Sequence, residues 1–161
     1  MYEKILVPLD GSSLSELALP HAEALAQHFR SEILLVRVFQ PFVVPFDLYT
    51  LGPDVTDSYN QELQTQAEQE TRDYLNHIQK RLRLKNIRSR CFVLGGVVTE
   101  SILDTAETEA VDLIVMSTHG RSGLSRWVYG SVASKILQAA SCPVFLVRAI
   151  NAQTERASYN A

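Results

Sequence analysis

Short apolar runs alternate with amphipathic segments along most of this chain, and this alternation restricts the folds open to it. Ile, Leu and Val fill four of the runs with little polar alternation, which is typical of parallel strands covered on both faces. A fifth run alternates arginine with smaller residues and suits a strand nearer the edge of a sheet. The strands that we predict cover residues 4–9, 32–39, 87–94, 112–117 and 143–148.

The first amphipathic segment begins with a Ser-x-x-Glu capping box formed by Ser13 and Glu16. Apolar residues then recur at helical spacing as far as Phe29. Pro20 lies within this helix, where a proline costs roughly 3 kcal/mol and removes a hydrogen bond. We therefore expect a kink there, or a helix that starts late.

The second amphipathic segment is the longest, and we expect its helix to begin near Asp57 or Ser58. Two shorter helices are predicted over residues 99–109 and 131–140. The resulting alternation of strands and helices predicts a single α/β domain, an open twisted parallel sheet with helices on both faces. The long helix is expected to turn these residues inward: Tyr59, Leu63, Ala67, Tyr74, Ile78 and Leu82.

Composition narrows the class of protein further. A chain of 161 residues suits one domain, and its net charge of −3 offers no basic field for nucleic acid. The basic residues between 80 and 90 suit a solvated helix end and an edge strand. No apolar run approaches the ~20 residues that cross a bilayer, and the start of the chain lacks signal-peptide features. We expect a cytoplasmic protein without membrane or nucleic-acid partners, in which Cys91 and Cys142 are reduced thiols that bind no metal.

The stretch 115–132 begins as a buried strand, loosens into a Gly/Ser-rich loop and resumes as a helix that opens on Gly130 and Ser131. Glycine lets the main chain approach a phosphate closely, and the first N–H groups of a helix are unpaired donors at the positive end of its dipole. The Ser131 hydroxyl can add a donor. This pattern favours a phosphate-binding loop. The alternative is an ordinary strand-to-helix connection in which Gly130 is a permissive turn residue.

Asp10 follows the first predicted strand, at the edge where ligands of open α/β sheets bind. If the first and fourth strands are neighbours, Asp10 faces the Gly-rich loop across one crevice. Its carboxylate could hydrogen-bond sugar hydroxyls or hold a metal ion near a phosphate. An N-cap or Asx turn ahead of Ser13 fits the same spacing.

Five short segments carry a resemblance to a known family. They are residues 7–12, 110–116, 118–124, 130–132 and 142–144, and in this order they resemble the universal stress protein family over almost the whole chain. The resemblance implies a Rossmann-like, adenine-nucleotide α-hydrolase-like fold with strand order 3-2-1-4-5, and a dimer. It assigns residues 1–149 to the universal stress protein domain and residues 150–161 to a polar C-terminal tail.

Many members of that family bind ATP through a motif of Gly, two residues, Gly, nine residues, Gly, and then Ser or Thr. Counting back nine residues from Gly130 reaches Gly120, and the position three before it is Ser117, where the motif has glycine. The alternative register through Gly123 leaves only six residues before Gly130. We expect binding to survive this departure, although the Cβ of Ser117 restricts how closely the main chain approaches a ligand.

The resemblance also implies roles for particular residues. Pro8, Asp10 and Val38 would line the nucleoside side, with the Val38 main chain pairing with adenine. Arg121 would assist as a cation. Ribose and phosphates would be held by Gly120, Gly130, Ser131 and Val132. The other candidate nucleotide-binding residues are Leu9, Met116, Ser117, His119 and Gly123.

Together these features predict a binding module for ATP or another adenine nucleotide, with or without Mg²⁺, that acts in stress response or signalling. The alternative is a dimeric stress or interaction protein that binds no nucleotide. Catalysis is disfavoured, and His119 is a weak candidate for a general base, because the chain has neither a phosphate-loop Gly-Lys-Ser/Thr nor a Gly-x-Ser-x-Gly elbow. We expect slow ATP hydrolysis at most.

The last predicted strand contains the apolar run Val144–Val147, and the implied strand order places it at an edge of the sheet. Unpaired main-chain groups on an apolar edge favour pairing with another strand. A two-fold axis would pair the same strand of two copies in antiparallel fashion. We therefore predict a homodimer through Val144–Val147.

Overall fold

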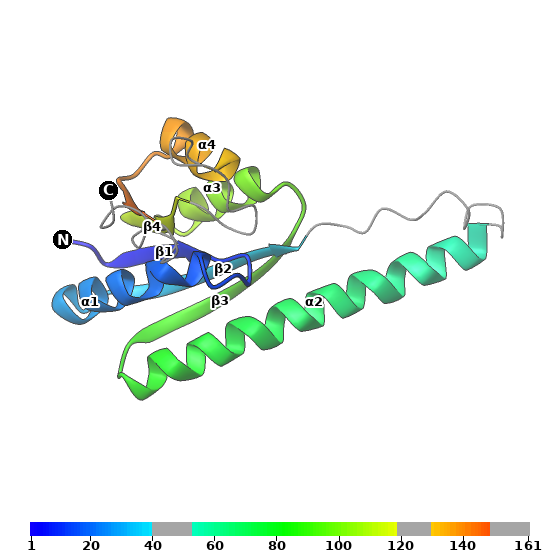
Figure 1. The fold of residues 1–161 in the computed structure, drawn as a ribbon, viewed down its shortest axis with the longest axis horizontal. Coiled ribbons are helices and arrows are strands. Elements are labelled where there is room, and N and C mark those ends of the chain that lie inside the picture. Colours follow the sequence, from blue (N-terminus) through cyan, green and yellow to red (C-terminus); the bar gives the residue numbers. More distant parts are fainter. Residues whose placement is uncertain (40–52, 119–129, 149–161) are drawn as a thin grey trace, which may run out of the picture.

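The computed structural model describes residues 1–39, 53–118 and 130–148 as one α/β unit (Figure 1). Strands and helices alternate along it, apart from a short 3₁₀ turn, η1, ahead of the first helix. The strands are β1 (Lys4–Pro8), β2 (Glu32–Phe39), β3 (Arg88–Gly95), β4 (Leu113–Ser117) and β5 (Val144–Val147). The helical elements are η1 (Ser15–Ala18), α1 (Leu19–Phe29), α2 (Pro53–Leu84), α3 (Val98–Thr108) and α4 (Ser131–Ala139).

All five strands form one sheet in the order β3-β2-β1-β4-β5, and every neighbouring pair is parallel. β1 lies at the centre, where Ile5 is the register partner of Ile33 in β2 and of Leu113 in β4. This confirms the predicted parallel sheet and its order, with strand bounds within one or two residues of those predicted. The sheet reverses its winding between β1 and β4, and the carboxyl ends of the strands at such a reversal are where open α/β sheets bind their ligands.

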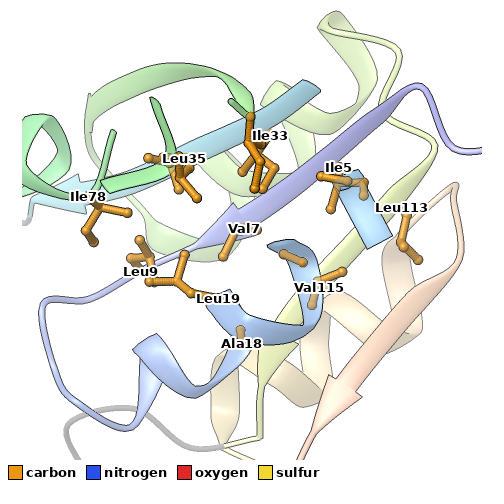
Figure 2. Close-up of a cluster of buried hydrophobic side chains, with 14 of the residues drawn as sticks. Ile5, Val7, Leu9, Ala18, Leu19, Ile33, Leu35, Ile78, Leu113 and Val115 are labelled. Carbon is orange, nitrogen blue, oxygen red and sulfur yellow. The ribbon is translucent and has the colours of Figure 1, made fainter. Parts of the chain in front are cut away.

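Both faces of the sheet are covered, because successive side chains of a strand point to opposite faces. Ile5 and Val7 of β1 lie in the cluster covered by α1 and α2, whereas Leu6 lies in the cluster covered by α3 and α4. Figure 2 shows the first cluster, with Leu19 of α1 and Ile78 of α2 directed at the strands. Successive apolar side chains of a strand are therefore buried on one face or the other, which explains why apolar and polar residues do not alternate in these runs.

The entry into α1 differs from the predicted capping box. Ser13 caps nothing here, since the residue before η1 is Leu14 and no side chain caps it. Instead the main-chain N–H of Ser15 donates to the Ser12 hydroxyl oxygen at 3.1 Å. The late start is confirmed, because α1 begins at Leu19 and Pro20 stands in its first turn, where a missing N–H costs no helical bond.

α2 begins at Pro53, earlier than the predicted Asp57 or Ser58, and proline is well suited to a first helical turn. Its second half packs on the sheet and buries Ile78 and Leu82 as predicted. Tyr59 is 39% exposed, so the prediction that it points inward is wrong. Figure 1 shows the reason, since the first half of α2 continues past the end of the sheet. None of the described helices, α2 included, is long and apolar enough to cross a membrane.

Candidate functional site

The two predicted ligand-binding segments lie at neighbouring strand ends. β1 pairs with β4, so Asp10, two residues beyond β1, and Thr118, directly after β4, leave the sheet at the same edge. The Thr118 carbonyl accepts a hydrogen bond from the Gly130 N–H at 2.9 Å, and the Thr118 N–H donates to the Val147 carbonyl at 2.9 Å. These bonds fix the start of α4 beside the ends of β4 and β5. The chain that leaves the sheet at Thr118 therefore returns to the same point at Gly130.

The Asp10 carboxylate forms the Asx turn that the sequence left open. Its Oδ1 accepts hydrogen bonds from the Ser12 N–H at 2.9 Å and from the Ser12 hydroxyl at 2.6 Å. The buried Ser15 hydroxyl donates to the Ser12 carbonyl at 2.9 Å and accepts from the Asp10 N–H at 3.3 Å. This turn orders the loop at the end of β1 and so holds the carboxylate in a defined place at the sheet edge.

The first turn of α4 offers main-chain donors at this edge. The Ser134 N–H donates to the Gly130 carbonyl at 2.9 Å, which closes the first helical turn and leaves the preceding N–H groups of the helix without intrahelical acceptors. Gly130 has φ −53° and ψ 151°, a conformation open to any residue. No positive φ requires glycine there, so the backbone conformation alone does not explain why position 130 is a glycine.

A second group of side chains supports the β1 loop, and sequence reasoning missed it. Gly11 has φ +84°, and a Cβ there would lie 3.0 Å from the Arg37 guanidinium. Arg37 stacks on the ring of Tyr74 in α2, 4.7 Å from its centroid, and the Tyr74 hydroxyl donates to Glu16 at 3.1 Å. Glu16 also pairs with Arg81 at 3.3 Å. One signal was available, since Arg37 interrupts the apolar run over residues 33–39.

The environment of the Tyr74 phenol raises its pKa above the ordinary value. Burial of the phenol is the main cause, and the negative charge of Glu16 and the hydrogen bond donated to it act in the same direction. Tyr74 therefore stays protonated and remains a donor to Glu16 throughout the neutral range. The Arg37–Tyr74–Glu16 cluster thus ties α2 to the loop that carries Asp10.

The described site residues lie at four places: the end of β1, the end of β4, the start of α4 and the end of β2. Val38 is the site residue in β2, two residues beyond the register partner of Pro8. Leu9 and Met116 are buried in the two core clusters, so only their main chains are available to a ligand. Four predicted residues lie outside the described part of the chain: His119, Gly120, Arg121 and Gly123.

The two cysteines are not bonded to each other, and burial raises the pKa of the thiols of both Cys91 and Cys142. Within the described ranges no three His, Cys, Asp or Glu side chains gather as they would around a metal ion. What the described site presents is therefore a carboxylate at the end of β1 and main-chain donors at the start of α4. A carboxylate accepts from hydroxyl groups, and helix N–H groups donate to anions.

Comparison with known proteins identifies the class. The universal stress protein family matches residues 1–148, and the chain belongs to that family. Universal stress protein YxiE of Bacillus subtilis is 30% identical, with 92% of this chain and all of that protein covered. The solved structure of MJ0577 from Methanocaldococcus jannaschii is 28% identical and superposes with a TM-score of 0.79 over 94% of this chain and 99% of its own. An Arabidopsis thaliana family member determined with AMP bound shares the fold, at 15% identity, a TM-score of 0.64, and coverage of 94% of each chain.

Proposed function

We propose that this protein is an adenine-nucleotide-binding module of the stress response, which takes ATP, ADP or AMP at the carboxyl ends of β1 and β4. The observation that carries the proposal is the meeting of the Asp10 turn with the first turn of α4 at one sheet edge. The AMP-bound relative supports it by showing that this fold accommodates an adenine nucleotide.

In this proposal each group of residues takes the part of the nucleotide that its chemistry suits. Asp10 accepts hydrogen bonds from ribose hydroxyls, and the main chain at Val38 pairs with the adenine edge. The N–H groups of Ser131 and Val132 bind phosphate oxygens at the positive end of α4. Gly130, whose own N–H donates to the Thr118 carbonyl, has no side chain and lets the phosphates approach the main chain closely. Pro8, Leu9, Met116 and Ser117 form the strand ends beneath the ligand, and Mg²⁺ accompanies the phosphates.

The segment that joins β4 to α4 supplies the rest of the proposed site. His119, Gly120, Arg121 and Gly123 belong to it. Since the described site presents no lysine to stabilise transferring charge, the proposed activity is binding, with slow hydrolysis at most. We place the protein in the cytoplasm.

Calorimetry with ATP, ADP and AMP on the parent chain and on Gly130→Asp and Gly130→Asn tests this function. Both substitutions suit the observed φ and ψ, and both residues are favoured ahead of a helix, so the fold should be kept. The aspartate adds a charge where a phosphate would sit, and it should weaken binding by at least about 100-fold. The neutral asparagine should cost much less. Equal affinities of parent and Gly130→Asp would remove α4 from the site.

A second function, dimeric interaction without nucleotide, draws support from Ser117, which stands where the family's ATP motif has glycine and is buried at the end of β4. Calorimetry decides between the two functions, because this alternative requires that none of the three nucleotides binds the parent.

Dimerisation is common to both proposals. β5 is an edge strand, and its Phe145 is 42% exposed.

We propose that β5 pairs with the same strand of a second copy. The carbonyls of Pro143 and Val147 accept from β4, so residues of that parity face β4, and the N–H of Val144 points outward. Val144→Pro should therefore block the dimer and keep the fold, whereas Val147→Pro should also damage the sheet. Analytical ultracentrifugation should show the parent at twice 18.0 kDa and Val144→Pro as a folded monomer. A monomeric parent at high micromolar concentration would exclude this interface.

A further inference from the structure

A hollow of about 960 Å³ lies between the second half of α2 and the amino ends of β2 and β3. It is at the opposite end of the strands from Asp10 and α4. Its walls carry several side-chain hydrogen-bond donors. These donors include the side chains of Asn76, Lys80, Arg83, Asn86 and Arg88.

The basic residues between 80 and 90 divide into two sets in the structure. One set has acidic partners, since Arg81 pairs with Glu16, Lys85 with Glu23, and Arg90 with both Glu32 and Glu109. The other set is Lys80, Arg83 and Arg88, and all three line the hollow. Within the described part of the chain, none of these three makes an ion pair.

The positions of these three cations make them converge on one volume. Lys80 and Arg83 are three residues apart on α2, so their side chains emerge on the same face of the helix. Arg88 begins β3 on the other wall, and one of its Nη atoms donates to the Arg30 carbonyl at 3.1 Å. That acceptor is uncharged, so it orients the guanidinium without neutralising it.

Two carboxylates also line the hollow, and both are already hydrogen-bonded to neighbours. Glu32 accepts from Arg90 at 3.2 Å, and Asp73 accepts from the side-chain amide of Gln69 at 3.0 Å. The Gln69 amide is uncharged and leaves the charge of Asp73 in place, whereas Glu32 is paired with Arg90. The lining therefore holds three cations against these two carboxylates, a local excess of positive charge in a chain whose net charge is −3. A local excess of positive charge of this kind favours an anion with several charges.

We propose that this hollow binds a small molecule bearing two or more phosphate groups. Guanidinium groups bind phosphate oxygens in pairs of parallel hydrogen bonds, and an ammonium group adds a point charge. Asn76 and Asn86 supply neutral donors beside them. The volume is within the roughly 300–1,000 Å³ range of small-molecule sites. The proposal does not rest on the nucleotide site, which lies at the other end of the sheet.

Calorimetry on the full chain tests it with two probes, inorganic tripolyphosphate and a hexose bisphosphate, which separate an inorganic from an organic source of the phosphates. Lys80→Glu and Arg83→Glu each change an exposed side chain, so the fold should be kept. Each should weaken binding of the probe by at least about ten-fold. Arg72→Glu makes the same charge change on α2 outside the lining and should stay within about two-fold of the parent.

The Gly130→Asp variant separates this site from the proposed nucleotide site. Probe binding that persists in Gly130→Asp and falls in Lys80→Glu and Arg83→Glu supports the hollow. Three results would overturn it: no binding to the parent at millimolar probe, an equal loss in Arg72→Glu, or a loss in Gly130→Asp with no effect of the two hollow variants. Failure of ATP to bind would leave the hollow's own outcome unaffected.

Discussion

The two ends of this sheet offer anions different kinds of binding group. At the carboxyl ends of β1 and β4 the donors are main-chain N–H groups at the start of α4, beside the Asp10 turn. At the amino ends of β2 and β3 they are long side chains, Lys80, Arg83 and Arg88. Main-chain donors follow from topology, because every parallel α/β sheet directs helix N-termini to the carboxyl ends of its strands. Side-chain donors depend on which charges happen to remain unpaired.

Different contacts support the two ends of the sheet. The Asp10 loop is held by short local bonds to Ser12 and Ser15, and by Arg37 and Tyr74 from elements distant in sequence. The hollow is held by α2 against β3, where the Gln79 side-chain amide donates to the Ser89 carbonyl at 2.8 Å. The bonds of Asp10 to Ser12 and Ser15 are local, so a change at Asp10 should leave binding at the hollow unaltered.

Asp10→Ala should have a larger effect than the Tyr74 substitution described below, and it should weaken binding only at the carboxyl ends of β1 and β4. Loss of hydrogen bonds from ribose hydroxyls to a carboxylate costs about 1.5–3 kcal/mol, or roughly 10–150-fold in nucleotide affinity. Thermal melts with and without ATP should show a lost ligand shift and a small fall in the unliganded melting temperature, since the Asx turn is also lost.

The matched control is Ser12→Ala. It removes the bond from the Ser12 hydroxyl to Asp10 and the bond that this hydroxyl accepts from the Ser15 N–H, but it keeps the carboxylate and its main-chain bond from Ser12. This variant should keep most of the ATP shift, and tripolyphosphate binding should be unchanged in both variants. A full ATP shift in Asp10→Ala would remove the carboxylate from the proposed site.

Tyr74→Phe should have a smaller effect, on stability. It removes the hydrogen bond to Glu16 and should cost about 1 kcal/mol at pH 7. Because the pKa of Tyr74 is raised in the folded protein, its contribution is fully present below the ordinary tyrosine pKa near 10 and is lost as the pH rises above it.

Denaturant unfolding of parent and Tyr74→Phe at pH 7 and above pH 10 measures this contribution. The stability difference between the two proteins should shrink at the higher pH. Comparing the two proteins at each pH cancels the titration of the other tyrosines and lysines. A difference that stays constant would mean that the phenol titrates as it does in the unfolded chain.

Local patterns predicted most of the fold. Apolar runs predicted all five strands, and the resemblance supplied their order. The start of α2 was missed because Pro53 precedes the apolar periodicity on which the prediction rested, and a proline is acceptable at a helix start. The capping prediction failed because Ser12, next to Ser13, makes the bond to Ser15. The start of a helix depends on a single hydrogen bond, whereas a strand depends on a whole run of apolar residues.

The candidate site was predictable only where it is local. The Asp10 turn and the Gly130–Ser131 helix start follow from short motifs. The stacking of Arg37 on Tyr74 joins residues far apart in the chain, and no periodicity shows it. Likewise, the sequence shows six basic residues between 80 and 90 but not which of them have acidic partners. Those partners, such as Glu16 for Arg81, lie on other elements and become known only from the fold.

The most direct test of a nucleotide site at the carboxyl ends of β1 and β4 is to locate bound ATP on the isotope-labelled full chain. In a titration followed by amide chemical shifts, we predict large changes at Asp10–Ser12, Val38 and Gly130–Ala133, with Lys80, Arg83 and Arg88 nearly unaffected at low ATP. The chemical shifts of the amides at the start of α4 should change most, because these N–H groups would bind the phosphates of ATP. Shifts confined to the hollow, or no shifts at millimolar ATP, would contradict a nucleotide site at the carboxyl ends of β1 and β4.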